Sequence, residues 1–123
     1  MLTEAQIRDD RWRERLSEKY GWMSGGSIRF ECLGGWRFLL EDTLSRIDAT
    51  LTGEERDDFF ISQVKEKFGE LRVYHNGSDA IGYIVECAEA ASSRTCDVCG
   101  RPGRLQGQGW ISVRCRDHET WRG

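Results

Sequence analysis

Four side chains in the C-terminal third could hold a metal ion: Cys96, Cys99, Cys115 and His118. They form a CxxC pair and a CxxH pair, separated by residues 100–114 with their glycine-rich turns and the apolar run WISV. Zinc prefers four tetrahedral ligands drawn from thiolate and imidazole, and small structural sites commonly supply them as two short pairs. The spacing therefore predicts Zn²⁺ in a zinc ribbon or treble-clef-like module closed by a short β-hairpin.

The same spacing indicates which chemistry the metal would serve. Four protein ligands leave zinc no free position for water, which favours a structural rather than a catalytic ion. A redox role for the CxxC pair is weaker, because thioredoxin-like motifs open a helix and have no second ligand pair downstream. Elsewhere the sequence identifies no nucleophile or carboxylate pair, and His75 has no evident partner. We therefore expect a non-enzymatic protein.

Charge is distributed unevenly along the chain. Residues 21–93 carry 7 Lys/Arg against 13 Asp/Glu, and residues 94–123 carry 6 against 3, all six of them arginines. Arginine suits bidentate contacts with phosphate or carboxylate, but several of these side chains could instead offset a zinc–thiolate centre of net charge about −1. The candidate binding residues of this tail are Arg101, Arg104, Trp110, Arg114, Arg116 and Trp121.

The two tryptophans of this tail have different expected roles. Trp110 lies on the hairpin that returns to the metal, where we expect it to roof the small core of the module. If it is exposed, it could instead stack on a base or anchor a protein partner. Trp121 lies three residues beyond His118, with little chain left to bury it, and is a candidate interface residue.

Hydrophobic periodicity predicts the elements of the body, residues 1–93. Helices are expected at 3–20, with Thr3 as the cap, at 35–51 as the central core helix, and at 78–92. A half-buried strand is expected at 27–32, with Cys32 in the core, and a hairpin at 59–75. In that hairpin Ile61, Gln63 and Lys65 would share one face and Ser62, Val64 and Glu66 the other.

These elements predict a single α+β domain. It would contain a small, about three-stranded antiparallel sheet covered by three helices, with a zinc-binding ribbon at 94–123 packed on the body. The polar connection at 51–59 should lie in solvent. At 123 residues the chain has room for one modest core and a small satellite module.

Composition also limits the compartment. No apolar run approaches the roughly 20 residues that a membrane span needs, and the charged N-terminus lacks the features of a signal peptide. Five cysteines, an odd number, fit reduced thiols and metal ligands better than a disulfide framework. We therefore expect a cytoplasmic protein without membrane contact.

Several motifs carry a resemblance: VKEKFGELR at 64–72, SSRTCDVCGRPG at 92–103, Gly35-Trp36 at a helix start and Ala88-Glu89. In these the chain resembles, over residues 28–118, short uncharacterised proteins of bacteria, phages and prophages with VKEKFGxLR and a CxxCGxPG zinc ribbon. That group has no established activity. The resemblance implies mobile-element biology, in which small proteins often bind and inhibit, or protect against, another protein.

Two functional hypotheses follow. The first is a non-enzymatic protein-binding inhibitor or adaptor of phage or prophage type, anti-defence or immunity-like, whose acidic body steers it toward a protein partner with a basic surface. The second is nucleic-acid binding through the arginines and Trp110 of the ribbon, which should weaken steeply with salt.

Overall fold

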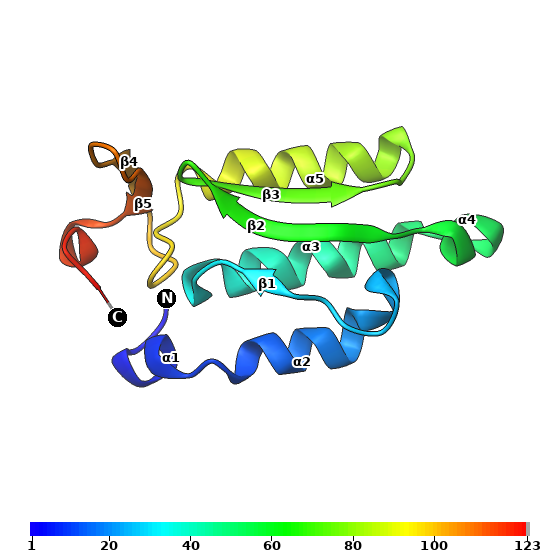
Figure 1. Ribbon diagram of the computed structural model, residues 1–123, viewed down its shortest axis with the longest axis horizontal. Helices are drawn as coiled ribbons and strands as arrows, with labels where there is room; N and C mark the ends of the chain where they lie inside the picture. The colour runs from blue at the N-terminus through cyan, green and yellow to red at the C-terminus, as the bar shows by residue number, and fades with distance from the viewer. Residues whose placement is uncertain (123) are drawn as a thin grey trace.

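The computed structural model describes residues 1–122. Within them five α-helices accompany a three-stranded sheet, and a two-stranded hairpin lies at one end, near both termini (Figure 1). The helices are α1 Glu4–Arg8, α2 Arg11–Tyr20, α3 Arg37–Thr50, α4 Gly53–Asp58 and α5 Asp79–Ser92. The strands are β1 Phe30–Glu31, β2 Ile61–Lys67, β3 Glu70–His75, β4 Arg104–Gln106 and β5 Ser112–Arg114. The α+β class is confirmed, and no helix among the described residues has the length and apolarity to cross a membrane.

The sheet is mixed, so the prediction of an antiparallel sheet is wrong for one pair. β2 and β3 form the expected antiparallel hairpin, whereas β1 pairs with β2 in parallel, Phe30 opposite Val64. The chain between β1 and β2 runs the length of α3 and through α4 before it returns. A crossover of this kind, unlike a tight turn, allows parallel pairing.

The predicted faces of β2 are wrong because the strand contains a bulge. Pairing shifts between Ile61 and Gln63, and both Ile61 and Val64 are buried although they are three residues apart. A bulge adds one residue to a strand and reverses the alternation beyond it. The inner face thus carries Ile61 and Val64, while Lys65 pairs with Arg72 on the outer face.

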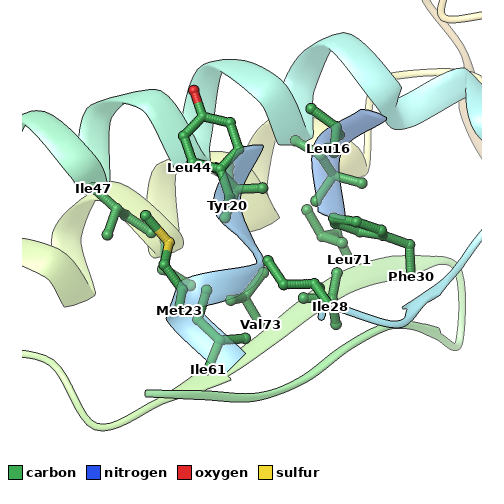
Figure 2. Packing of buried hydrophobic residues seen from close by; sticks show 14 of the residues in the cluster. Leu16, Tyr20, Met23, Ile28, Phe30, Leu44, Ile47, Ile61, Leu71 and Val73 are labelled. Atoms are coloured by element: carbon green, nitrogen blue, oxygen red, sulfur yellow. The ribbon is translucent and has the colours of Figure 1, made fainter. Parts of the chain in front are cut away.

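The core lies between the sheet and the helices α2, α3 and α5. Figure 2 shows Leu16 and Tyr20 of α2 converging with Leu44 of α3 and with Leu71 and Val73 of β3. The central helix at 35–51 is confirmed as a short 3₁₀ turn followed by α3. The connection at 51–59 contains the short helix α4 rather than only loop, and its charged side chains are largely exposed as expected.

The N-terminal helix predicted at 3–20 is broken into α1 and α2. Thr3 caps α1 as expected, in a capping box with Gln6. The Asp9 carboxylate then accepts hydrogen bonds from the backbone and side chain of Arg11, a local pattern that ends helices. The buried guanidinium of Arg37, from the start of α3, donates to the carbonyls of Gln6 and Asp9 and so satisfies the end of α1.

Side chains cover both edges of the sheet. Arg13 of α2 donates to the carbonyls of Phe30 and Cys32 on the β1 edge. On the β3 edge the Leu71 amide donates to Ser92 Oγ at 2.9 Å. Uncovered edges invite pairing with other chains, so these contacts disfavour extension of the sheet.

Candidate metal centre and ribbon surface

The four predicted ligands lie together in the structure. Their donor atoms are all within 4.8 Å of one another, and the three cysteines are buried. The Cys99 and Cys115 Sγ atoms are 3.7 Å apart, and His118 Nδ1 is 3.2 Å from Cys115 Sγ and 4.0 Å from Cys96 Sγ. Tetrahedral zinc with sulfur at ~2.3 Å and nitrogen at ~2.0 Å separates its ligand atoms by roughly 3.5–3.8 Å. The arrangement therefore fits a metal ion of this type.

The first ligand pair lies in a tight turn that depends on a glycine. Gly100 adopts φ +83°, a left-handed conformation, and its amide donates to the Cys96 carbonyl at 3.0 Å. The Cys96 amide donates in turn to the Arg101 carbonyl at 2.7 Å. These bonds close the loop so that both sulfurs point to the same side.

The second ligand pair is brought to the first by the returning hairpin. The Asp97 amide donates to the Val113 carbonyl at 2.9 Å, which joins the CxxC loop to β5. A 3₁₀ turn at Arg116–His118 then places His118 beside Cys115. The predicted hairpin is thus present as β4 and β5.

Burial makes thiolates costly at this centre unless a cation is bound. Cys99 is 1% exposed, and burial raises the pKa of its thiol to about 12, with the nearby Cys96 and Cys115 adding to the effect. The structure contains no disulfide among the five cysteines, all of which are free thiols. A divalent cation would supply the charge that the deprotonated form needs.

The ribbon contacts the start of α3 and the N-terminal segment. The Gly35 amide donates to the Asp97 carbonyl at 2.9 Å, and Trp36 Nε1 donates to the Thr95 carbonyl at 2.9 Å. A Cβ atom on Gly35 would lie 2.4 Å from the Cys96 carbonyl oxygen, so only glycine allows this approach. The Leu2 amide donates to the Cys99 carbonyl at 3.0 Å.

Arg114, a predicted binding residue, lies inside the ribbon. Its Nε atom is 2.6 Å from Asp97 Oδ1, and both side chains are at least 90% buried. Its Nη1 group also donates to the carbonyls of His118 and Trp121. Burial raises the pKa of Asp97 to about 6, although the Arg114 charge opposes the shift. The guanidinium is therefore an internal counter-charge for the Asp97 carboxylate.

The other predicted arginines differ in how free they are. Arg101 pairs with Asp117 at 2.8 Å and also touches Met1 Sδ. Arg104 is largely exposed, with Glu119 at 4.0 Å, and Arg116 is exposed without a carboxylate within 4.0 Å among residues 1–122. Of the four, Arg104 and Arg116 are the most exposed, and Arg104 has only the distant Glu119 carboxylate near it.

The structure contradicts one of the two expectations for the tryptophans. Trp110 does not roof the core of the ribbon: it is 77% exposed. The alternation of β5 directs Val113 and Cys115 inward, and they fill the small interior, while Trp110 forms a wall of an open cleft of about 420 Å³ between β1 and β5. Trp121 is half-buried against the cysteines, and its role as an interface residue stays a prediction.

Sequence reasoning missed two exposed apolar side chains near Trp110, those of Phe68 and Leu105, and we name these three residues together the tip patch. All three are exposed, Phe68 by 71%. Leu105 and Ile111 pack against Gly69 in the turn between β2 and β3. Phe68 has φ +53°, which a bulky side chain rarely adopts, in a two-residue turn that usually takes Asn-Gly. The dipeptide Phe68-Gly69, in place of Asn-Gly between two predicted strands, is the sequence signal that could have identified this turn.

Two further candidate groups have structural roles. His75 Nδ1 accepts a hydrogen bond from the Gly77 amide at 2.9 Å, and burial lowers the pKa of its imidazole. Cys32 is buried in the core as predicted, and burial raises the pKa of its thiol to about 12.

Comparison with known proteins adds no relative. No family model matches the chain, and neither a curated protein nor a solved structure is significantly similar to it. The geometry itself defines the class: an α+β protein with a C-terminal Cys₃His cluster that could hold a metal ion.

Proposed function

We propose that the protein is a non-enzymatic protein-binding module, an inhibitor or adaptor of phage or prophage type, whose ribbon is folded by a structural Zn²⁺. The donor set of three thiolates and one imidazole favours zinc over hard cations, which prefer oxygen ligands. Four protein ligands complete a tetrahedron and leave no position for a reactant. The metal would thus stabilise the fold of the ribbon, and the protein surface around it would bind the partner.

The tip patch is the observation that carries this proposal. Its three members are 71%, 56% and 77% exposed: Leu105 lies close to Gly69, the neighbour of Phe68 in the turn, and Trp110 precedes Ile111, which also approaches Gly69. Exposed aromatic side chains on a rigid support are typical anchors of protein interfaces. Phe68 also has an unfavourable backbone conformation, and its exposed side chain gains little burial to offset that strain. Backbone strain of this kind is concentrated at functional sites.

The nucleic-acid alternative receives support from Trp110, Arg104 and Arg116, which are exposed. Against it, two of the ribbon arginines form ion pairs within the ribbon. Arg101 pairs with Asp117, and Arg114 pairs with Asp97. Binding to phosphate needs several free cations in one place, because each one contributes through released counterions. The small number of free cations, together with the exposed apolar side chains of the tip patch, therefore favours a protein partner over nucleic acid.

The proposal is tested with the zinc-loaded full chain as bait in host-cell lysate, with and without nuclease. We expect a partner protein to be recovered in both samples, and to be lost with Trp110→Ala and with Phe68→Asn. Phe60→Ala serves as the matched control, because Phe60 is also exposed but lies at the opposite end of β2. Its capture should equal that of the unchanged chain.

Two outcomes would overturn the proposal. Recovery that disappears with nuclease, together with affinity for single-stranded DNA or RNA that falls steeply with salt, would establish the alternative. If Trp110→Ala, Phe68→Asn and Phe60→Ala all recovered the same amount of partner protein as the unchanged chain, the tip patch would not be part of the interface.

A further inference from the structure

The open cleft between β1 and β5, which we name the ribbon cleft, has a volume of about 420 Å³. Phe30, Cys32 and Leu33 at the end of β1 form its apolar lining, and Trp110 of the ribbon lines it as well. Phe30 and Cys32 are buried, whereas Trp110 is 77% exposed. None of the four candidate metal ligands lines the cleft. It therefore offers an apolar floor and an aromatic wall outside the metal centre.

The charged residues that line the ribbon cleft are three acids and two arginines: Glu31, Glu66, Asp97, Arg13 and Arg114. Both arginines are already paired. Arg114 pairs with Asp97, and Arg13 pairs with Asp10, which does not line the cleft. Glu31 and Glu66 have no cation within 4.0 Å among residues 1–122. The charges without an ion-pair partner are thus both negative.

The Glu66 carboxylate is held in position at the end of β2. Its Oε2 atom accepts a hydrogen bond from the Gly69 amide at 2.6 Å. Burial raises the pKa of the Cys32 thiol to about 12, the Arg13 charge opposes the shift, and the charges of Asp97 and Glu66 add to it. Glu66 therefore lies close enough to Cys32 to act on the interior of the cleft. A carboxylate that is already ordered loses little conformational entropy when it binds a cation.

These features favour an organic cation over other ligands. A metal ion is disfavoured because, among residues 1–122, only the Cys₃His cluster brings three such ligand atoms within 4.8 Å of one another. An anion is disfavoured because both arginines are engaged. A guanidinium group, by contrast, is planar, stacks on the face of an indole ring and forms paired hydrogen bonds with a carboxylate. The aliphatic stem of an arginine would pack on the apolar floor.

We propose that the ribbon cleft binds an arginine side chain of the partner protein, with the guanidinium on Trp110 and its N–H groups directed to Glu66 and Glu31. This inference rests on the proposed function, because Trp110 belongs to both the tip patch and the cleft. It gives the partner a chemistry: an exposed arginine at the point of contact. The excess of acidic residues in segment 21–93 would attract such a partner.

The probe for the test is N-acetyl-arginine methylamide, titrated into the zinc-loaded full chain. NMR follows the indole N–H of Trp110 and the backbone amide of Ser112, which also lines the cleft. N-acetyl-citrulline methylamide is the matched neutral probe, because it has nearly the same shape without the charge. We expect saturable binding of the arginine probe in the millimolar range, and binding of the citrulline probe that is weaker by about threefold or more.

Variants assign the binding to the cleft. Glu66→Gln keeps an oxygen for the Gly69 amide but removes the charge, and it should weaken binding of the arginine probe about threefold. Trp110→Ala should weaken it by a similar factor. Glu54→Gln is the matched control, because it makes the same change in charge on α4, at the opposite end of the molecule from the ribbon (Figure 1). It should leave affinity within about 1.5-fold, since salt screens distant charges.

Several outcomes would overturn the proposal. They are absent binding of the arginine probe, equal binding of the citrulline probe, and equal loss of affinity in Glu66→Gln and Glu54→Gln. Tighter binding of N-acetyl-glutamate methylamide would also overturn it, because the cleft would then select an anion.

Phe68→Asn separates failure of this inference from failure of the proposed function. Phe68 belongs to the tip patch but does not line the cleft, so this variant should lose partner capture and still bind the arginine probe. Loss of capture with Phe68→Asn and Trp110→Ala, combined with absent binding of the probe, would retain the proposed function and reject the arginine site. Specific binding of the probe without any captured partner protein would retain the guanidinium site and reject the proposed function.

Discussion

Residues 1–93 bury a continuous cluster of aromatic and aliphatic side chains, whereas in residues 94–122 three of the four clustered buried residues, Cys96, Cys99 and Cys115, are candidate metal ligands. The body therefore has enough apolar area to fold by burial. The ribbon does not, and modules of that size usually need a metal or disulfides. The chain thus has two sources of stability, apolar burial in the body and metal coordination in the ribbon.

The largest expected effect is on the ribbon alone. Cys99→Ser removes a buried ligand, and we expect bound zinc to fall from about one ion per chain to background and the ribbon to lose its fold. Elemental analysis measures the metal, and hydrogen exchange should show loss of protection at 95–118 while α3 and β2 stay protected. Cys87→Ser, on the exposed side of α5, should retain the zinc. Full zinc in Cys99→Ser would refute the ligand assignment.

The next effect distinguishes two arginines of the ribbon. Arg114→Met leaves the buried Asp97 carboxylate without its cation and should cost about 3 kcal/mol in the free energy of unfolding. Arg116→Met, two residues away and exposed, should change stability by less than about 0.5 kcal/mol. Urea denaturation of the zinc-loaded variants measures both. Equal effects would mean that Arg114 is not an internal counter-charge.

A smaller effect tests the joint between the two regions. Gly35→Ala places a Cβ atom against the backbone of Cys96 and Asp97 and should cost about 2 kcal/mol by overpacking. Gly82→Ala, in α5, meets nothing within 4 Å and should stabilise the protein by up to about 1 kcal/mol. Thermal denaturation compares the pair, and a neutral Gly35→Ala would show that the ribbon does not press on α3.

The smallest effect has the opposite sign. Phe68→Asn replaces a bulky residue at φ +53° with one that tolerates the left-handed region and should raise the free energy of unfolding by about 1 kcal/mol. Little burial is lost because Phe68 is 71% exposed. A gain in stability measured by urea denaturation, together with loss of partner capture, would indicate that the body retains strain for binding. Destabilisation would show instead that Phe68 supports the turn.

Sequence reasoning predicted the parts that depend on local spacing. The ligand set followed from CxxC and CxxH, the core helix from apolar steps of three and four residues, and the hairpin at 59–75 from alternation with Gly69 at its turn. Each of these signals lies within a few neighbouring residues.

The sequence predictions were wrong where residues far apart in the chain determine strand pairing, helix ends or side-chain burial. The parallel pairing of β1 depends on the crossover through α3, which alternation within Phe30–Glu31 does not encode. The break between α1 and α2 is completed by Arg37, far along the chain. Trp110 is exposed because Val113 and Cys115 fill the small interior of the ribbon instead, and Arg114 is buried because Asp97 and the carbonyls of His118 and Trp121 enclose its guanidinium, neighbours that composition alone does not predict.

The tie between Arg37 and the end of α1 also bears on the order of folding. A five-residue helix does not persist alone in water, because nucleation costs more than its few hydrogen bonds return. The Asp9 amide gives the Gln6 carbonyl a local partner, but the carbonyls of Gln6 and Asp9 gain their side-chain partner only once α3 and its buried guanidinium are in position. We therefore expect residues 4–8 to form last as the chain collapses and to open first under native conditions.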